Sequence, residues 1–349
     1  MSFSQTILKW YVVNKRTLPW RSTVDPYKIW LSEIMLQQTR VAQGTPYYLK
    51  FVEHFPTVAH LADASEDQVL KLWQGLGYYS RARNLHATAK RVAYEMNGKF
   101  PDTYAELIKL KGVGDYTASA IASICFGELQ PVLDGNVFRV LARYFGVDTP
   151  INDSTGPKYF KKLAQKVMPE SDIRDYNQGI MEFGAIQCGP KKPYCLHCPL
   201  SESCVALQTN QVHLLPIKLK KTKLRKRYFN YLVVLGQNEN GEIASLLNQR
   251  KGKGIWENLW EFPLIETKGS ITLTEIKKQL PATLKPISEP NISLYNSKEI
   301  VHKLSHQHLH TKFWILKSEA VLRSGIPWKK LEEYAVPVLI AEFLKTFKI

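Results

Sequence analysis

The fold of this chain is decided by the stretch Leu110-Lys111-Gly112-Val113-Gly114-Asp115-Tyr116-Thr117-Ala118. Two glycines form a tight turn ahead of a helix rich in small residues. Glycine reaches positive φ without strain and lets backbone N–H groups come close to a phosphate. The turn therefore predicts a hairpin between two helices, in which Gly112 and Gly114 contact a nucleic-acid backbone without reading its bases. Most Gly-x-Gly turns are ordinary loops, so support must come from the surrounding sequence.

The sequence on both sides of this turn is predicted to be mainly helical, from residue 1 to about 205. Asp25-Pro26 supplies an N-cap and a first-turn proline, and Tyr27, Trp30 and Ile34 follow at helical spacing. Similar helical patterns cover roughly 57–73, 81–97, 102–109, 115–126, 134–145 and 157–167. Glycine or proline marks the breaks between them, and strand-like alternation is scarce.

The character of the sequence changes after Cys204. Residues 216–227 carry many cations and no acid, which predicts an exposed connector that either lies against phosphates or is merely solvated. Residues 231–235 and 313–316 are typical of strands, and 338–347 of a closing helix. We therefore expect a helical domain over 1–206, a basic linker over 207–227 and an α+β domain over 228–349.

Length and charge limit the classes of function. A chain of 349 residues predicts two domains, and the excess of 47 basic over 31 acidic residues, a net charge of +16, favours a polyanionic partner. A solvated surface explains the charge equally well, but eight Trp and 17 Tyr favour a nucleic acid, because aromatics among cations stack on bases. No stretch is apolar enough to span a bilayer, and the first residues lack a secretion signal. We expect an intracellular, cytoplasmic protein that associates with DNA.

Four of the five cysteines lie close together, at Cys188, Cys195, Cys198 and Cys204. Clustered thiols in a chain without a secretion signal indicate a metal site rather than disulfides. Zinc ribbons usually present two Cys-x2-Cys pairs, whereas only one such pair is present here. The spacing therefore favours a [4Fe–4S] cluster, with zinc as the alternative. The loop 190–193 adds two lysines, so the cluster is expected to brace a phosphate contact.

Two acidic residues are candidates for catalysis. Glu33 lies in Ile29-Trp30-Leu31-Ser32-Glu33-Ile34-Met35-Leu36, where burial should raise its pKa and keep it protonated near neutrality. Asp134 precedes Gly135-Asn136 at the expected start of a helix, where it is either an ordinary N-cap or a carboxylate kept ionised by backbone amides. An acid beside an ionised carboxylate is the pair that glycosidic-bond hydrolysis uses.

The hairpin, the segment 132–137 and the cysteine quartet together resemble the helix–hairpin–helix glycosylase superfamily, which usually has proline where this chain has Lys111. Within it, the chain resembles the MutY family of adenine glycosylases. The segments that carry this resemblance are Leu18-Pro19-Trp20-Arg21, Asp25-Pro26-Tyr27, Ser32-Glu33-Ile34-Met35-Leu36-Gln37-Gln38-Thr39 and Gly75-Leu76-Gly77-Tyr78-Tyr79-Ser80-Arg81-Ala82-Arg83-Asn84-Leu85. They cover most of residues 16–204.

The resemblance implies a role for each catalytic residue. Glu33 would protonate adenine at N7 and then activate water, and Asp134 would stabilise the sugar cation, either as an ion or through a transient covalent adduct. Asn136 and Tyr116 would orient and support this pair. Endonuclease III-like relatives carry a lysine at the position of Tyr116, which forms a Schiff base and cleaves the strand. A phenol cannot do so, and residue 116 therefore predicts a monofunctional glycosylase.

The resemblance also implies how DNA is held while a base is flipped out of the duplex. Gln38 and Tyr78 would wedge into the base stack. Leu36 and Thr39 would contact the opposite base, and Arg21 and Gln178 would hold the edge of adenine. Core packing is the alternative for Tyr78, but the neighbouring Arg81 and Arg83 indicate a DNA-facing surface.

Residues 228–349 resemble the C-terminal domain of the MutY family, which is related to Nudix hydrolases. The Gly-x5-Glu-x7-Arg-Glu-x2-Glu-Glu box of those hydrolases is missing, so we do not expect a catalytic Mg²⁺ site. Leu304-Ser305-His306 matches the loop that contacts 8-oxoguanine, with leucine where phenylalanine often stands. Contacts through Ser305 and His306 are expected, whereas leucine at residue 304 lacks the ring that a stacking contribution needs.

The sequence thus predicts a monomeric, base-flipping glycosylase that removes adenine mispaired with 8-oxoguanine, or with guanine, and leaves an abasic site. An endonuclease III-like lyase for oxidised pyrimidines, a non-catalytic sensor of DNA damage and a zinc protein are the alternatives.

Overall fold

The computed structural model describes residues 1–219, 224–281, 284 and 291–349. The chain divides into two compact units. The first unit comprises Met1–Ala64 with Arg83–Lys220, and the second comprises Ser65–Ala82 with Lys221–Ile349. Residues 220–223 of the expected linker lie outside the described residues. No helix within the described residues has the length and apolar character needed to cross a membrane.

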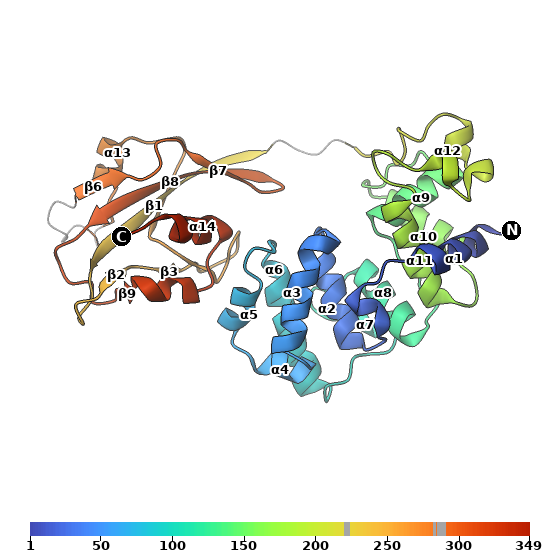
Figure 1. The fold of residues 1–349 in the computed structure, drawn as a ribbon, viewed down its shortest axis with the longest axis horizontal. Coiled ribbons are helices and arrows are strands. Elements are labelled where there is room, and N and C mark those ends of the chain that lie inside the picture. The colour runs from blue at the N-terminus through green and yellow to red at the C-terminus, as the bar shows by residue number, and fades with distance from the viewer. Residues whose placement is uncertain (220–223, 282–283, 285–290) are drawn as a thin grey trace. The chain divides into compact units, whose positions relative to one another are not determined.

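The first unit is built of helices and short helical turns, and no strand is assigned to it among the described residues (Figure 1). Its α-helices are α1 (Phe3–Asn14), α2 (Pro26–Leu36), α3 (Val41–His54), α4 (Val58–Asp63), most of α6 (Ser80–Lys90), α7 (Tyr104–Leu107), α8 (Asp115–Phe126), α9 (Gly135–Phe145), α10 (Gly156–Val167), α11 (Ile173–Ile186) and α12 (Val205–Gln208). The shorter turns are η1 (Pro19–Ser22), η2 (Arg91–Glu95, a π-helix), η3 (Cys195–His197) and η4 (Ser201–Ser203).

The expected helices are mostly present, with one clear difference. The pattern over 57–73 is two helices, α4 and α5 (Glu66–Leu72), rather than one. Ser65 caps α5: its side chain accepts from the backbone N–H of Gln68, whose side chain accepts in return from the backbone N–H of Ser65. This capping box starts a new helix inside an apolar pattern that continues across the break.

Two left-handed glycines end the helices that carry the site. Gly127 follows α8 with φ 71°, and Gly146 follows α9 with φ 65°. Glycine adopts this conformation without the cost that a Cβ imposes, so each helix stops at a defined residue. Helix α2 packs on α8, and α11 packs on α1, α8 and α9. The starts of α8 and α9 are thereby held near α2 and α11.

Part of the expected linker is fastened to the first unit. The backbone N–H of Ile151 donates to the carbonyl of Ile217 at 3.0 Å, and the Asn152 side chain exchanges two hydrogen bonds with the backbone of Leu219. Nε of Arg143 donates to the carbonyl of Leu215 at 3.0 Å. Residues 215–219 therefore have fixed partners, unlike a freely solvated linker.

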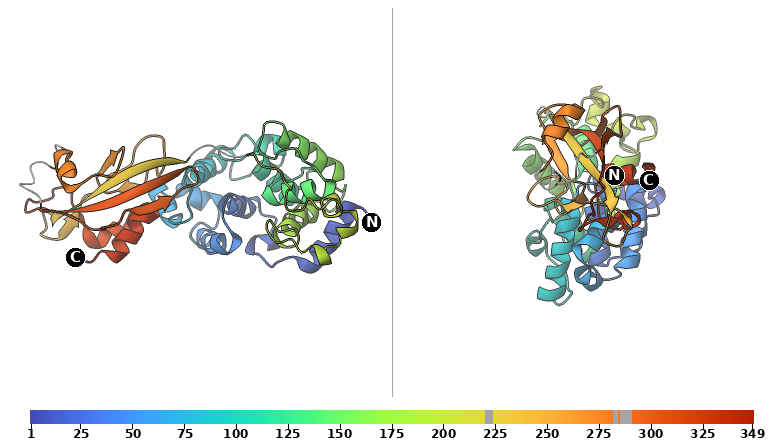
Figure 2. Two further views of the ribbon diagram at one scale, coloured as in Figure 1. Left: turned by 90° about the horizontal axis from the view of Figure 1, so that it is seen from above. Right: turned by 90° about the vertical axis from the view of Figure 1, so that its left-hand side faces the viewer.

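The second unit contains a mixed sheet with the path β6-β8-β1-β2-β9, to which β5 and β7 add at the sides. The strands are β1 (Arg225–Gln237), β2 (Ile243–Ser245), β5 (Leu264–Thr267), β6 (Asn291–Leu294), β7 (Ile300–Lys303), β8 (Gln307–Lys317) and β9 (Ile326–Pro327), with β3 (Asn248–Gln249) and β4 (Trp260–Glu261) as a separate pair. Strands β1 and β8 run parallel and side by side in both views of Figure 2, with Tyr231 opposite Phe313. Both predicted strands thus form the centre of the sheet.

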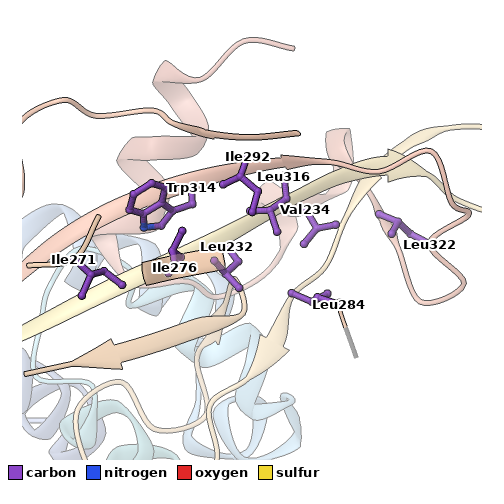
Figure 3. Packing of buried hydrophobic residues seen from close by; sticks show 9 residues of the cluster. All are labelled: Leu232, Val234, Ile271, Ile276, Leu284, Ile292, Trp314, Leu316 and Leu322. Atoms are coloured by element: carbon purple, nitrogen blue, oxygen red, sulfur yellow. The ribbon is translucent and has the colours of Figure 1, made fainter. Parts of the chain in front are cut away.

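The two faces of this sheet bury alternate residues of β1. Leu232 and Val234 belong to one cluster with Trp314 of β8 and Ile276 of α13 (Leu273–Lys278), as Figure 3 shows. On the other face, Phe313 stacks on Phe343 of α14 (Val338–Thr346) with ring centroids 4.2 Å apart. The sheet therefore lies between two helices, and the 3-10 turn η6 (Trp328–Glu333) leads into α14.

Residues 65–82 cluster with this second unit through polar contacts. Nδ2 of Asn258 donates to Oε1 of Glu66 at 2.6 Å, and Nζ of Lys71 donates to the carbonyl of Tyr334 at 3.2 Å. These contacts are made by residues far apart in sequence, which explains why continuous sequence patterns did not reveal them.

Candidate active site

A cavity of about 700 Å³ opens in the first unit. It lies where the C-terminal halves of α2 and α11, the starts of α8 and α9 and the turn η1 come together. Of the residues singled out from the sequence, it is lined by Arg21, Glu33, Leu36, Gln38, Thr39, Gly114, Tyr116, Asp134 and Asn136. The fold therefore brings the two acidic candidates, about 100 positions apart, to one cavity.

Glu33 is almost completely buried on α2, with 8 % of its surface exposed. Burial raises the pKa of its carboxyl to about 7; a hydrogen bond with Tyr116 lowers it, Asp134 raises it further and Arg21 lowers it. At neutral pH a large fraction of Glu33 is therefore protonated. A carboxylic acid with such a pKa can both give and regain a proton in one turnover.

Asp134 is the N-cap of α9 and is surrounded by donors. Its Oδ1 accepts from the backbone N–H groups of Asn136 and Val137, each at 2.8 Å, and its Oδ2 accepts from Nδ2 of Asn136 at 2.6 Å. Burial raises the pKa of Asp134, and these hydrogen bonds oppose the rise. Every one of these contacts offers a proton to Asp134, which suits an ionised carboxylate.

Tyr116 is a buried phenol on the first turn of α8. Its hydroxyl hydrogen-bonds with Glu33 and contacts Sδ of Met181 at 3.3 Å. Burial, together with the nearby Glu33 and Asp134, raises the pKa of Tyr116 well above its ordinary value. The phenol therefore stays neutral and holds the Glu33 carboxyl in place.

Arg21 lines the cavity, but its guanidinium is already paired. Its Nη1 and Nη2 donate to the two oxygens of Glu182 at 3.0 and 2.8 Å. Gln178 does not line this cavity; it is buried, and its Oε1 accepts from the hydroxyl of Tyr11 at 2.7 Å. The structure thus places Arg21 on the wall of the cavity, while Gln178 is outside its lining.

The residues after α2 form one rim of the cavity. Leu36, Gln38 and Thr39 all line it, and Gln38 is exposed with φ 56°. A positive φ is uncommon for a residue with a side chain and is found often at functional sites. Gln38 thus stands in a turn with a backbone conformation that glutamine does not favour.

Tyr78 and Arg81 belong to the second unit. Tyr78 is 44 % exposed and has φ 48°, while the adjacent Tyr79 is buried. Nη2 of Arg81 donates to the carbonyls of Leu76 and Gly77, and its guanidinium lies over the ring of Tyr78 at 5.5 Å. Arg81 therefore supports the loop that presents Tyr78, and burial lowers its pKa to about 10.

The hairpin ahead of α8 depends on Gly112. Its φ is 79°, and a Cβ added there would meet Cβ of Asn84 at 2.7 Å. Gly114 is different: it is the extended N-cap of α8, and an added Cβ would meet nothing within 4 Å. The carbonyl of Lys111 accepts from Oγ1 of Thr88 at 2.8 Å, so the turn is anchored without the proline usual in the superfamily.

The four clustered cysteines line one small pocket. They are free thiols in this structure, and Nη1 of Arg143 donates to Sγ of Cys188 at 3.4 Å and to the carbonyl of Gly189 at 2.8 Å. Among the described residues, no three His, Cys, Asp or Glu side chains are arranged so as to hold a metal ion. Four soft thiol ligands on one pocket beside a guanidinium nevertheless fit an anionic iron–sulfur cluster in the chemistry of their donor set.

The cysteine loop is joined to the cavity by Arg139 of α9. Its Nε donates to the carbonyl of Cys188 at 2.7 Å, and its Nη2 donates to Oδ1 of Asn136 at 2.8 Å. Asn136 in turn donates to Asp134. A chain of hydrogen bonds thus runs from the first cysteine to the carboxyl of Asp134.

Ser305 and His306 form the exposed tip of the hairpin between β7 and β8 in the second unit. The turn closes through the backbone N–H of Leu304, which donates to the carbonyl of Gln307 at 2.8 Å. Oγ of Ser305 and Nδ1 of His306 lie 3.3 Å apart. Both side chains are therefore available to a ligand at a defined turn.

Glu182 and Arg16 also line the cavity, and neither was singled out from the sequence. Glu182 lies in Ile180-Met181-Glu182-Phe183, an acid in an apolar run like that around Glu33. The same argument that selected Glu33 would have selected Glu182. Arg16 carries no comparable signal.

Comparisons with known proteins agree with this arrangement. Residues 31–172 match the family described as HhH-GPD superfamily base excision DNA repair protein, and residues 232–346 match the NUDIX domain. The solved structure of a thermostable thymine-DNA glycosylase is 32 % identical with a TM-score of 0.55, and the match covers 59 % of this chain and 95 % of that one. The expected fold class, a helical glycosylase domain plus a Nudix-like domain, is confirmed.

The curated relatives are similar over most of their length. The adenine DNA glycosylase of Buchnera aphidicola subsp. Baizongia pistaciae is 39 % identical over 319 residues, covering 90 % of this chain and 86 % of that protein. The adenine DNA glycosylase of Rattus norvegicus is 33 % identical over 402 residues, covering 100 % of this chain and 78 % of that protein. The chain therefore belongs to the family of adenine DNA glycosylases, the MutY family of the helix–hairpin–helix superfamily.

Proposed function

We propose that this chain hydrolyses the N-glycosidic bond of adenine mispaired with 8-oxoguanine or guanine in duplex DNA, acting as a monomer inside the cell and leaving an abasic site. One observation carries the proposal. Glu33, with a pKa of about 7, and Asp134, held by three donated hydrogen bonds, line the same cavity of about 700 Å³. A protonated acid and an ionised carboxylate with different surroundings are what glycosidic hydrolysis requires.

In the proposed reaction, Glu33 gives its proton to N7 of the extruded adenine. The bond between the sugar C1′ and N9 then breaks, and its electron pair leaves with the base. The carboxylate of Asp134 stabilises the cationic sugar, while Asn136 and Tyr116 keep the two carboxyl groups oriented. Water adds its hydroxyl to C1′ and returns a proton to Glu33, so the enzyme ends as it began.

The other candidate residues would bind the flipped nucleotide and fill the space that it leaves in the duplex. Gln38 and Tyr78, both at positive φ, are the proposed wedges. Leu36 and Thr39 would contact the opposite base. Arg21 would contact the adenine edge with Gln178 behind it, and Arg81 would support Tyr78. Gly112 and Gly114 shape the hairpin whose free backbone N–H groups at the start of α8 would hold a phosphate.

Cys188, Cys195, Cys198 and Cys204 would hold a [4Fe–4S] cluster in the pocket that they line. Bound there, the cluster supplies no electrons to a hydrolysis; it cross-links the loop. Two exposed lysines, Lys191 and Lys192, lie on that loop, which Gln187 closes by donating from Nε2 to the carbonyl of Tyr194 at 2.6 Å. A braced, cationic loop suits a phosphate contact.

In this proposal, residues 1–206 carry out catalysis, residues 207–227 connect the two domains and residues 228–349 recognise 8-oxoguanine. Ser305 and His306, at the tip of the hairpin, would contact the oxidised base. Replacing both with alanine should reduce the preference for adenine opposite 8-oxoguanine over adenine opposite guanine, while leaving the release opposite guanine nearly unchanged.

The test of the whole proposal is release of the base from duplexes that carry adenine opposite 8-oxoguanine, guanine or thymine. We expect the fastest release opposite 8-oxoguanine and no covalent complex after borohydride. A borohydride-trapped complex would instead support a lyase, and tight binding without any release would support a damage sensor.

A further inference from the structure

Glu182 gathers two arginines at the wall of the cavity. Its Oε1 accepts from the backbone N–H of Arg16 at 3.0 Å, from Nε of Arg16 at 2.7 Å and from Nη1 of Arg21 at 3.0 Å. Its Oε2 accepts from Nη2 of Arg16 at 2.7 Å and from Nη2 of Arg21 at 2.8 Å. One carboxylate thus orients both guanidinium groups.

This cluster is a built feature of the cavity. Arg16, Arg21 and Glu182 all line it, and the Glu182 side chain is only 1 % exposed, against 15 % for Arg21 and 41 % for Arg16. Burial alone would raise the pKa of Glu182, but the hydrogen bonds from Arg16 and Arg21 lower it to about 2. Glu182 is therefore ionised at any working pH, and the three side chains together carry a net charge of +1.

We propose that Glu182 is a positioning residue that fixes Arg16 and Arg21. The three side chains form a cationic wall of net charge +1, and this wall sets the electrostatic field in which Glu33 gives and takes its proton. This inference deepens the proposed function and rests on it. Glu182 acts by holding Arg21, which lines the same cavity as Glu33 and whose charge lowers the pKa of Glu33. An unpaired buried charge is costly, so the carboxylate and its arginines act as a unit.

The effect of the wall on Glu33 can be separated from the effects of its other neighbours. Among the described residues, the titratable or charged groups that act on Glu33 are Tyr116 and Cys125 of α8, Asp134 at the start of α9 and Arg21 of η1. Glu182 is faced by Arg16, Arg21 and the phenol of Tyr11 on α1. Substitutions at Glu182 and Arg16 change the charge of the wall while leaving every group that faces Glu33 in the sequence.

The sign of each effect follows from Coulomb's law. Glu182→Gln raises the charge of the wall from +1 to +2, which favours ionised Glu33 and lowers its pKa. Arg16→Gln lowers the wall to 0 and raises the pKa of Glu33. The double variant returns the wall to +1. Because the reaction needs protonated Glu33, the pH at which the rate falls on the alkaline side should shift in the same direction as the pKa of Glu33.

The experiment measures single-turnover adenine release against pH for the full-length holoenzyme and these three variants. We expect the alkaline midpoint to fall by about half a pH unit or more in Glu182→Gln, to rise similarly in Arg16→Gln and to return near the parent value in the double variant. If Glu182 and Arg16 had a merely structural role, the variants would be slower, but their alkaline midpoints would not shift in opposite directions and would not return to the parent value in the double variant. Glu106→Gln, which removes an acid from the exposed pair with Lys109, is the control and should leave the midpoint in place.

Equal midpoints in all four proteins would overturn the inference while the parent enzyme still released adenine. Failure of the proposed function would look different, because the parent itself would then release no adenine, or Glu33→Gln would release it normally. Should Glu182→Gln fail to fold, Arg16→Gln alone decides, since Arg16 is 41 % exposed and its loss leaves the pair of Arg21 with Glu182 intact. An unmoved midpoint in that variant would refute the field effect.

Discussion

Arg139 donates from Nε to the carbonyl of Cys188 at 2.7 Å, while Nη2 of the same guanidinium donates to Asn136 at 2.8 Å. The cysteine loop is therefore linked to the carboxyl of Asp134 through one guanidinium and the side chain of Asn136. Because a guanidinium is planar, its two hydrogen bonds fix the direction of the Cys188 carbonyl relative to Asn136.

Replacing Arg139 with methionine should uncouple the loop from the cavity. It would leave the carbonyls of Cys188 and Gly184 without this donor, and we expect a loss of about 2–4 kcal/mol of unfolding free energy with slower adenine release. Urea unfolding and single-turnover kinetics measure the two effects. Arg139→Lys keeps the charge but loses the several N–H donors of the guanidinium, so its stability and its rate of release should lie between those of the parent and the methionine variant. Unchanged rate and stability in the methionine variant would show that this chain of hydrogen bonds has no role.

Glu33→Gln should reduce adenine release by at least about 100-fold while sparing the affinity for DNA, since the amide keeps the shape of the side chain but cannot give a proton. Release is measured under single turnover and affinity by titration of a labelled duplex. Normal release by this variant would remove Glu33 from its proposed role.

The pH dependence of rate and stability should both report Glu33. Its pKa is raised from 4.5 to about 7, so the rate should fall as pH rises through about 7. The folded state binds the extra proton, and stability should likewise decline between about 4.5 and 7, by up to about 3 kcal/mol. Thermal melts of parent and Glu33→Gln at pH 5 and pH 8 test this, with the variant expected to gain most at pH 8. If the melting temperatures of parent and Glu33→Gln differed by the same amount at pH 5 and at pH 8, the raised pKa of Glu33 would be contradicted.

Gly112→Ala should destabilise the hairpin, while Gly114→Ala is the matched control. A Cβ at residue 112 meets Asn84 at 2.7 Å and stands at φ 79°, whereas one at residue 114 meets nothing within 4 Å. The first change should cost about 1–3 kcal/mol and weaken DNA binding regardless of sequence, and the second should cost little. Equal stabilities of the two variants would mean that the turn tolerates a side chain.

Cys198→Ser should remove the proposed [4Fe–4S] cluster, and Cys125→Ser should not. Cys198 lines the cysteine pocket, whereas Cys125 lies on α8. We expect the first variant to lose the broad absorption near the visible edge and its bound iron and sulfide, and to bind DNA more weakly. Zinc in the purified parent, with no such absorption, would favour the alternative metal.

Local patterns predicted most of the elements and selected the candidate groups. The apolar run around Glu33, the Asp-Gly-Asn start of α9 and the cysteine spacing are all readable within short windows. Residues 231–235 and 313–316 were recognisable as strands because buried strands are rich in apolar residues. The break at Ser65 was missed because a capping box interrupts the helix while the apolar pattern continues.

Other features required the folded chain. The clustering of residues 65–82 with the C-terminal residues, the pairing of Arg21 with Glu182 and the hydrogen bond from Tyr11 to Gln178 all involve partners distant in sequence. No window of sequence contains both members of such a pair.

By itself, the sequence determined which side chains are available and which short segments are helix, turn or strand, because propensity, capping and periodicity act over a few residues. Only the tertiary structure decided which of them meet. The pKa of Glu33, its hydrogen bond with Tyr116 and the charge carried by the arginine wall are set by burial and by neighbours up to 166 positions away along the chain. Electrostatic fields and desolvation depend on distance in space, and the order of residues does not contain that distance.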